Sequence, residues 1–264
     1  LLCGAPAVCA AVLDAAAEWD GEIPGRGTVR MVVAGAPPPT ATIERMETEL
    51  GWEFIQIYGL TETAPLLTIC RNREEWDELT PTDRARKLSR AGSPAIGITM
   101  KTSQSGELLA QGNVVLKSYW DNPDASAQAL EGGWFHTGDG GYRDDEGYYS
   151  ITDRKKDVII SGGENVSSIE VEDVLFSHPE VSEVAVIGVP HEKWGETVKA
   201  LVVLVDGASA TDQDLIAYCR DRLAHYKCPT SIETRSELAR TATGKLQKFK
   251  LREPYWEGRA KQIN

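Results

Sequence analysis

The segment Ile151–Glu164 reads I-T-D-R-K-K-D-V-I-I-S-G-G-E, and it decides how the rest of the chain is interpreted. A charged run, Asp153–Asp157, leads into a short apolar stretch and then into the glycine pair Gly162-Gly163. Branched apolar residues favour a strand, and glycines let the backbone turn where a side chain would obstruct it. The combination predicts a hinge that leads into an active site. For the isolated segment, the alternative is a solvated charged run followed by an ordinary turn.

The composition is that of a soluble globular protein. The 264 residues are 41% hydrophobic, which is enough to bury a real core in one large or two smaller domains. A formal net charge of -12 and a sequence pI near 4.9 argue against nucleic acid as a partner. The five cysteines are an odd number without C-x-x-C spacing, so they indicate neither a disulfide framework nor a zinc site. A reducing cytoplasm fits this cysteine usage best.

The start of the chain is apolar, but Gly4, Pro6 and Asp14 interrupt the run and no basic segment precedes it. It is shorter than the roughly 20 residues that a membrane helix needs, so we predict no transmembrane segment here. A strand end that leads into a buried helix is the expected structure. Because the chain begins with Leu1, we also expect that an N-terminal portion precedes it.

The first part of the chain shows the strand, helix, strand order of an α/β sheet. A β-branched run over 29–35 is followed by a predicted helix over 41–50, with Thr40 as its N-cap, and by a strand over 54–58. Ligands tend to bind at the carboxyl ends of such strands, where Gly35-Ala36-Pro37 and Tyr58–Thr61 both fall. We therefore expect these two loops to face one pocket.

The pattern then changes twice. Residues 71–90 are charge-rich and predicted to be partly helical, and residues 91–152 alternate short strands with glycine turns, which indicates a small β subdomain. From residue 153 the chain predicts strands over 158–160, 184–190 and 198–205 and helices over 168–178 and 211–223. The predicted fold class is therefore α/β and α+β. Residues 1–152 form the end of a large α/β domain with the β subdomain, and residues 153–264 form a hinged, compact α+β domain.

Further motifs stand at a distance from the opening segment. In their order and approximate spacing, the motifs resemble those of the adenylate-forming superfamily, and the chain resembles its acyl-CoA synthetases over nearly all its length. The resemblance implies the C-terminal half of an acid–thiol ligase. Such an enzyme activates a carboxylic acid, fatty or aromatic, with ATP and Mg²⁺ as an acyl-adenylate and transfers the acyl group to CoA. Together with the opening segment Ile151–Glu164, the motifs are Tyr58-Gly59-Leu60-Thr61-Glu62-Thr63, Trp134-Phe135-His136-Thr137-Gly138-Asp139 and Thr241-Ala242-Thr243-Gly244-Lys245.

The resemblance assigns the first motif to the nucleotide. The Tyr58 ring would pack against adenine, and Gly59 would let the backbone approach the nucleotide. The Thr61 hydroxyl would bond the α-phosphate, and Glu62 would supply an oxygen ligand to Mg²⁺. Taken alone, the same hexapeptide is also consistent with a strand end and an N-capping threonine.

Other nucleotide contacts are implied upstream and downstream. Gly35, Ala36 and Pro37 would form a wall of the adenine and acyl pocket, where a simple turn is the alternative. Asp139 and Arg154 would bond the ribose hydroxyls, with a turn-capping aspartate as the alternative for Asp139. His136 has no evident partner, and we interpret it as a packing or polar-surface histidine.

The remaining roles fall on the second half of the chain. Asp153 matches the hinge residue about which the C-terminal domain rotates between its two working arrangements. Ser161, Gly162 and Gly163 would line the tunnel for the pantetheine arm of CoA. Lys245 matches the lysine that bonds the substrate carboxylate and phosphate during adenylation. Lys248 and Lys250 are interpreted as surface lysines.

Departures from the family pattern leave alternatives open. Nothing in the chain resembles the family's loop rich in glycine, serine and threonine that holds the β- and γ-phosphates. The hairpin over 97–106 is also shorter than usual, so a segment is expected to be absent there. One alternative is an adenylating enzyme that delivers acyl groups to a carrier protein. The other is a non-catalytic nucleotide-binding fragment.

Overall fold

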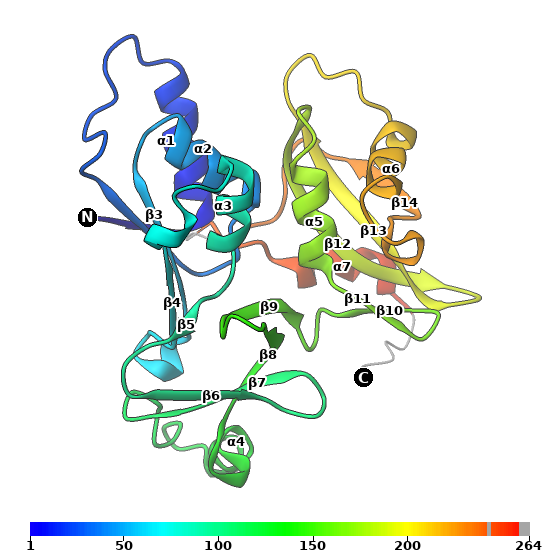
Figure 1. Cartoon of the computed structure of the whole chain (residues 1–264). Coiled ribbons are helices and arrows are strands. Elements are labelled where there is room, and N and C mark those ends of the chain that lie inside the picture. The colour runs from blue at the N-terminus through cyan, green and yellow to red at the C-terminus, as the bar shows by residue number, and fades with distance from the viewer. Residues whose placement is uncertain (242–243, 259–264) are drawn as a thin grey trace. The chain divides into compact units, whose positions relative to one another are not determined.

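In the computed structural model, which describes residues 1–241 and 244–258, the chain forms two compact units, Leu1–Ile151 and Thr152–Asn264 (Figure 1). Among the described residues, no helix has both the length and the apolar character needed to span a bilayer.

The first unit is built on a five-stranded sheet in the order β1-β2-β3-β4-β5. Strands β1 to β3 are parallel, and β4 and β5 are antiparallel to their neighbours. The crossovers between the parallel strands are helical, as such connections require. The strands are β1 (Leu2–Gly4), β2 (Arg30–Val33), β3 (Glu53–Tyr58), β4 (Thr68–Arg71) and β5 (Ser93–Pro94), and the helices are α1 (Pro6–Ala17), α2 (Thr40–Thr48) and α3 (Pro81–Leu88).

The three helices cover one face of this sheet with a common core. Met31 and Phe54 from the strands pack with Leu13, Met46 and Leu88 from the helices, and all five are at most 1% exposed. The predicted strands and the strand-to-helix start of the chain are confirmed. The predicted cap of α2 is wrong, because Thr40 is already the first helical residue and Pro39 precedes it without a side-chain cap.

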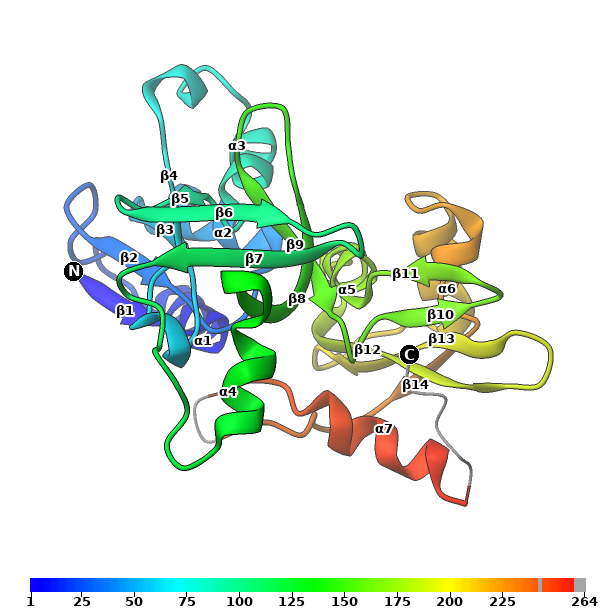
Figure 2. The ribbon, with the colours of Figure 1, turned by 90° about the horizontal axis from the view of Figure 1, so that it is seen from below.

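A second, four-stranded antiparallel sheet in the order β6-β7-β8-β9 forms the predicted β subdomain. Figure 2 shows β6 and β7 running side by side. Its strands are β6 (Ile98–Thr102), β7 (Glu107–Gly112), β8 (Phe135–Arg143) and β9 (Tyr149–Arg154), with α4 (Pro123–Ala129) inserted before β8. Short 3₁₀ turns are η1 (Thr61–Thr63), η2 (Glu74–Trp76), η3 (Glu131–Gly133) and η4 (His225–Lys227), the last in the second unit.

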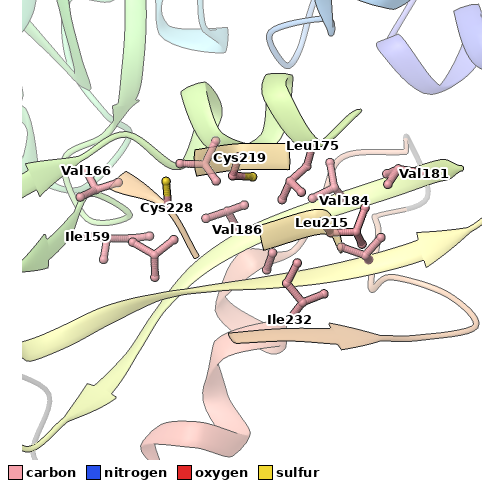
Figure 3. Packing of buried hydrophobic residues seen from close by; sticks show 14 residues of the cluster. Ile159, Val166, Leu175, Val181, Val184, Val186, Leu215, Cys219, Cys228 and Ile232 are labelled. Atoms are coloured by element: carbon pink, nitrogen blue, oxygen red, sulfur yellow. The ribbon is translucent and has the colours of Figure 1, made fainter. Parts of the chain in front are cut away.

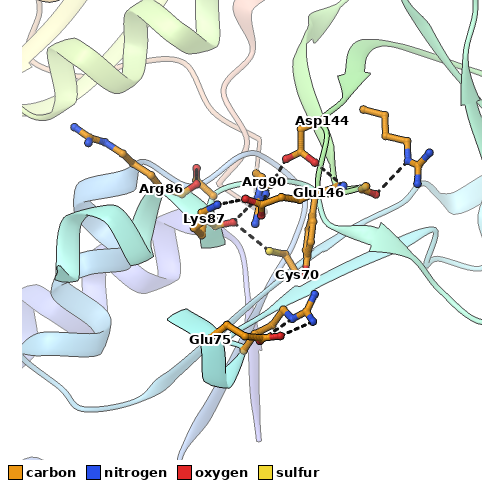
Figure 4. Close-up of polar contacts among 12 residues, drawn as sticks. Cys70, Glu75, Arg86, Lys87, Arg90, Asp144 and Glu146 are labelled. Atoms are coloured by element: carbon orange, nitrogen blue, oxygen red, sulfur yellow. Dashed lines mark hydrogen bonds and ion pairs between the residues drawn. The ribbon is translucent and has the colours of Figure 1, made fainter. Parts of the chain in front are cut away.

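A buried arginine fastens the two sheets of the first unit together. The Arg90 guanidinium, just after α3, lies 2.7 Å from Asp144 and 2.9 Å from Glu146 in the turn between β8 and β9 (Figure 4). It also stacks over the Tyr148 ring at 3.9 Å. Nearby, the Cys70 thiol donates to the carbonyl of Lys87, and burial raises its pKa to about 12. The Arg90 contacts hold the β8–β9 hairpin against the five-stranded sheet and α3.

The second unit contains a five-stranded sheet covered on both faces. Along β12, Val184 and Val186 face one side while Ala185, Ile187 and Val189 face the other, which is why the sequence there is continuously apolar. Figure 3 shows the first set packed with α5 and α6 residues such as Leu175 and Leu215, whereas the second set packs with Leu251 of α7. The elements are β10 (Ile159–Ser161), β11 (Glu164–Val166), α5 (Ser168–Phe176), β12 (Val181–His191), β13 (Gly195–Leu204), α6 (Asp212–Arg220), β14 (Ser231–Thr234) and α7 (Lys248–Trp256).

Candidate functional site

Two predicted nucleotide residues from distant parts of the sequence meet in the first unit. The Tyr58 hydroxyl at the end of β3 donates to Asp139 Oδ2 on β8 at 2.8 Å, and both side chains are buried. The Asp139 amide in turn donates to Thr137 Oγ1 at 3.1 Å, and that hydroxyl donates to the Leu108 carbonyl at 2.8 Å. The Asp139 carboxylate is therefore held in place by both sheets of this unit.

The loop after β3 turns sharply through η1. The Thr63 hydroxyl accepts from the Leu60 amide at 2.9 Å, so the threonine that bonds the turn backbone is Thr63, while Thr61 is exposed. A side chain on Gly59 would place its Cβ 1.7 Å from the Pro65 carbonyl oxygen. Glycine is thus required at 59 by the path of the chain itself, whatever the loop binds.

Glu62, the predicted metal ligand, is half-buried and has a tyrosine partner. The Tyr119 hydroxyl donates to Glu62 Oε1 at 3.0 Å, and the Leu116 amide donates to the Glu62 carbonyl at 2.7 Å. Burial raises the pKa of Tyr119, and the Glu62 carboxylate raises it further. No group of three or more histidine, cysteine or acidic residues that could hold a metal occurs in the described part of the chain. A single carboxylate suits Mg²⁺, which keeps several waters and binds mainly through substrate phosphates.

The predicted pocket wall follows the neighbouring parallel strand. Gly35-Ala36-Pro37 leaves the carboxyl end of β2, and β2 pairs in parallel with β3, so this loop and Tyr58-Gly59 leave the same edge of the sheet. Gly35 has φ +94°, a conformation that favours glycine. The topology therefore places both loops at one edge of the sheet, and a shared pocket stays a prediction.

His136, interpreted from the sequence as a packing or polar-surface histidine, has a partner that the sequence did not indicate. Its Nδ1 lies 3.2 Å from Oε2 of Glu107, a buried carboxylate on β7. The other oxygen of Glu107 accepts from the Gly138 amide at 3.0 Å. Glu107 therefore supports the part of strand β8 that presents Asp139. Because His136 and Glu107 lie on adjacent strands, 29 positions apart, the local sequence around either residue does not reveal the pair.

Asp153 is buried at 3% exposure, so the interpretation as a solvated charge is wrong for this residue. Its Oδ2 accepts from the amide and the hydroxyl of Ser168 at 2.9 and 2.5 Å, and its Oδ1 accepts from the Arg154 amide at 2.8 Å. Ser168 is the first residue of α5, where unpaired amide groups favour a carboxylate. Arg154, Lys155 and Lys156 are exposed, as a solvated run would be.

Lys248 was predicted to lie on the surface, and this prediction is also wrong. Its Nζ lies 2.7 Å from Glu172 Oε1, with side chains 14% and 17% exposed, and it donates to the Ser168 hydroxyl. Burial lowers the pKa of Lys248, but the carboxylates of Glu172 and Asp153 outweigh burial and leave that pKa above its usual value. The lysine is drawn inward because it begins α7, whose Leu251 is buried. Lys250 is exposed, as predicted.

The glycine pair forms a two-residue hairpin turn between β10 and β11. Gly162 and Gly163 have φ of +62° and +89°, the geometry that favours glycine in such turns. The Gly162 amide donates to the Trp194 carbonyl at 3.1 Å, and the Trp194 ring stacks on His191 at 4.4 Å. Ser161 pairs with Glu164 and Gly195 in the sheet. The turn accounts for the glycines, and their contact with CoA remains a prediction.

Lys245 is exposed on a tight loop. The Thr241 amide donates to the Lys245 carbonyl at 2.8 Å, and the Lys245 amide donates to Thr241 Oγ1 at 3.1 Å. Arg240 braces the loop by donating to the Gly244 carbonyl at 2.7 Å and by pairing with Glu183 at 2.6 Å. Ala242 and Thr243, which belong to the predicted motif, lie outside the described residues.

A surface pocket of about 520 Å³ in the first unit contains none of the predicted site residues. Its charged lining residues pair with one another, Arg84 with Glu47 at 2.8 Å and Arg71 with Glu53.

Comparison with known protein families decides where this chain belongs. Residues 1–120 match the model of the AMP-binding enzymes, and residues 170–245 match that of the AMP-binding enzyme C-terminal domain. The chain belongs to the AMP-binding enzymes. Thr61 and Glu62 lie within the first matched range, Lys245 ends the second, and Asp139, Asp153 and Arg154 lie between the two.

Relatives within the AMP-binding enzymes include CoA ligases. The chain is 42% identical to a 2-methylpropanoate–CoA ligase of Humulus lupulus, with 96% of this chain and 48% of the relative aligned. It is 39% identical to a 4-hydroxybutyrate–CoA ligase of Metallosphaera sedula, over 95% of this chain and 47% of the relative. The chain thus spans about half the length of the curated relatives that it matches.

Solved structures of AMP-binding enzymes share the fold. An anthranilate CoA ligase in complex with anthranoyl-AMP superimposes with a TM-score of 0.81 at 30% identity, over 96% of this chain and 49% of that chain. An amide bond synthetase from Marinactinospora thermotolerans gives 0.82 at 31% identity, over 96% of this chain and 52% of that chain. The mixed α/β and α+β architecture is therefore that of the adenylate-forming enzymes.

Within this AMP-binding fold, sequence reasoning missed supporting residues rather than the motifs themselves. Three of them bond a predicted residue directly, across a gap in sequence that no local pattern spans, and the other two, Glu172 and Lys248, are linked to Asp153 through Ser168. They are Glu107, Tyr119, Ser168, Glu172 and Lys248.

Proposed function

We propose that this chain supplies the C-terminal part of an ATP- and CoA-dependent acid–thiol ligase. The observation that carries the proposal is the buried Tyr58–Asp139 pair at the carboxyl end of β3, beside Thr61 and Glu62, in a chain related to CoA ligases. A tyrosine ring with a fixed carboxylate next to it suits an adenine ring and the hydroxyls of its ribose. Gly35, Ala36, Pro37 and Arg154 would complete the nucleotide contacts.

The proposed reaction has two steps. A free carboxylate does not acylate a thiol at a useful rate, because its oxygen is a poor leaving group. The carboxylate oxygen therefore attacks the α-phosphorus of ATP, and the bond to pyrophosphate breaks. The thiol sulfur of CoA then attacks the acyl carbon, and the bond to AMP breaks. Positioning and charge stabilisation supply most of the catalysis in such chemistry.

The residues of each unit have assigned roles in this scheme. Thr61 donates to the α-phosphate, and Lys245 carries positive charge to the carboxylate and phosphate during the first step. Glu62 would hold Mg²⁺, which when bound neutralises charge on the phosphates. Ser161, Gly162 and Gly163 would accommodate the pantetheine arm in the second step, after rotation at Asp153.

The proposed substrate class is a small aliphatic or aromatic carboxylic acid. The relatives named for 2-methylpropanoate, trans-cinnamate, 4-hydroxybutyrate and anthranilate support this class. The similarity to an amide bond synthetase supports a second candidate, in which the acyl group is transferred to an acceptor other than CoA. A carrier protein is one such acceptor, and the first step would be the same.

A pyrophosphate-release screen tests the proposal. The full-length protein is offered carboxylic acids of graded length and aromatic character, each with CoA, with a phosphopantetheinylated carrier protein, or with no acceptor. Acid-dependent pyrophosphate release with formation of an acyl-CoA is the expected result. Pyrophosphate release with acylation of the carrier protein and not of CoA would favour the second acceptor. Absence of pyrophosphate release with every acid would contradict the ligase and leave nucleotide binding as the function.

A further inference from the structure

One buried ammonium joins the two segments of the second unit to which function is assigned. Lys248 begins α7, directly after the loop that carries Lys245. Its Nζ donates to the Ser168 hydroxyl, and that hydroxyl donates to Asp153 Oδ2. The hinge segment and the lysine loop, far apart in sequence, are thus connected through two consecutive hydrogen bonds.

Lys248 and α7 make further contacts with β12 and with the hinge segment. Glu172, which pairs with Lys248 at 2.7 Å, also accepts from the Val186 amide at 2.7 Å and so ties the ammonium to β12. One turn further along α7, Arg252 lies 3.5 Å from Asp157 and donates to the Lys156 carbonyl at 3.3 Å. Helix α7 therefore contacts the hinge segment 153–157 directly through Arg252 and is linked to it through Ser168 by Lys248.

In the described part of the lysine loop, Leu246 and Ala239 pack against the apolar cluster on β12, and Arg240 and Lys248 add polar attachments. The Gln247 amide donates to the Ala239 carbonyl at 2.8 Å, which closes the loop on itself. Arg240 attaches one end of the loop to Glu183 on β12, and Lys248 attaches the other end to α5. Removing the Lys248 contacts would take away the polar attachment of the loop to α5 and leave apolar packing to hold that end.

We propose that Lys248 is a positioning residue that makes the hinge segment and the Lys245 loop move as one body. Its effect on catalysis rests on the proposed function. Lys248 would keep Lys245 at a fixed position relative to Asp153 during adenylation. Because the Asp153 carboxylate is bonded to α5, rotation of ψ at Asp153 would break those bonds. The backbone torsions that turn the second unit therefore lie before the Cα–C bond of Asp153.

To remove the Lys248 charge without leaving Glu172 unpaired, both residues are replaced together. Lys248→Met alone would leave Glu172 buried without its partner, which is strongly destabilising. Lys248→Met combined with Glu172→Gln removes both charges, keeps an acceptor for the Val186 amide, and fills the same volume. Ser168→Ala interrupts the same connection without changing any charge. The matched controls are Lys250→Met, an exposed lysine on α7, and Ser177→Ala, an exposed serine at the end of α5.

Hydrogen exchange with mass spectrometry of the full-length proteins tests the proposal without requiring activity. In the double variant, amides 244–247 are expected to exchange about 10- to 100-fold faster than in the parent, as for loss of a charged hydrogen bond. Amides in the β12–β13 ladder should keep the parent rates, and Ser168→Ala should act in the same direction. Loop exchange no faster than in the controls, or faster exchange throughout the unit, would overturn the proposal.

The kinetic arm uses the acid found in the pyrophosphate screen. Adenylation by the double variant is expected to fall about 10- to 100-fold, because Lys245 occupies its working position for less of the time. The KM for ATP should change little. Parent-like adenylation in a variant with a loosened loop would contradict the link to Lys245. A parent without activity would refute the proposed function and leave the exchange result to decide the connection.

Discussion

The Asp139 carboxylate accepts a hydrogen bond from Tyr58 and is also proposed to bind the nucleotide. Two substitutions distinguish these two roles. Asp139→Ala should weaken AMP binding by about 1.5–3 kcal/mol, the usual value for hydrogen bonds to a charged group. Tyr58→Phe removes only the hydroxyl that donates to Asp139 and keeps the ring, so it should retain most of the AMP affinity. Isothermal calorimetry measures both. Equal AMP affinity in Asp139→Ala and the parent would sink the assignment.

Tyr119 is expected to orient Glu62 for the metal. Tyr119→Phe removes the hydroxyl that donates to Glu62 Oε1, so the carboxylate loses its fixed direction. Loss of such an outer partner typically costs about 10- to 100-fold in metal affinity. The measurement is the Mg²⁺ concentration that half-saturates the effect of the metal on ATP binding, with the exposed Tyr142→Phe as control. An unchanged or lower concentration in Tyr119→Phe would contradict the orienting role.

At the scale of elements, strongly patterned segments were predictable and isolated short helices were not. A strand buried on both faces, such as β12, is continuously apolar in sequence. A helix buried on one face, such as α5 or α6, shows apolar residues at the helical period. Both patterns can be recognised from the sequence. Helix α4 has only seven residues, and α7 contains Pro254, so neither shows a clear period. Thr40 satisfies the N-cap preference, yet the chain enters α2 one residue earlier, after Pro39.

For the candidate site, the sequence indicated the motif residues but not the residues that support them. Motif residues follow from local sequence, whereas their partners depend on how elements pack. Tyr119 and Glu62 are 57 positions apart, and Lys248 and Ser168 are 80 apart. No periodic pattern encodes such a pair. A lysine such as Lys248 has a long apolar stem and a charged end, so the sequence alone is compatible with either an exposed or a buried ammonium. The fold thus follows from the sequence more completely than the support of the site does.

The buried cysteines are expected to be unreactive in the folded protein. Burial raises the pKa of Cys9 in α1 to about 11 and the pKa of Cys70 in β4 and of Cys219 in α6 to about 12. A raised thiol pKa means that the thiolate, the reactive form, is scarce at pH 8 and stays scarce until the pH approaches those values. Cys3 is exposed.

Iodoacetamide treatment at pH 8 followed by mass spectrometry checks this expectation. Cys3 should be modified first in the folded protein, and the buried thiols only after unfolding in guanidinium. The unfolded sample serves as the control that every cysteine can react. Modification of Cys70 or Cys219 in the folded protein as rapidly as Cys3 would mean that α3 or α6 opens readily.

At the scale of the whole molecule, the division into two units falls inside β9, between Ile151 and Thr152 and one residue before Asp153. Each unit has its own core, so a rotation at this point would leave both cores intact. Proline at Asp153 would restrict φ, but it would also delete the carboxylate that holds Ser168. A substitution that reports on rotation alone must therefore leave the Asp153 side chain in place.

Lys245→Ala tests whether the two steps use different arrangements of the second unit. In the proposed first step, the Lys245 ammonium offsets the charge that develops at the α-phosphorus, a contribution of about 3–4 kcal/mol by analogy with single preorganised donors. The full-length variant should therefore lose adenylation by about 10²–10³-fold. It should still convert supplied acyl-adenylate and CoA to thioester at nearly the parent rate, because the lysine is not assigned to that step. Lys250→Ala, an exposed lysine in the same unit, should leave both steps unchanged. Unchanged pyrophosphate release in Lys245→Ala would assign this lysine to the surface, and an equal loss in both steps would favour one arrangement for both.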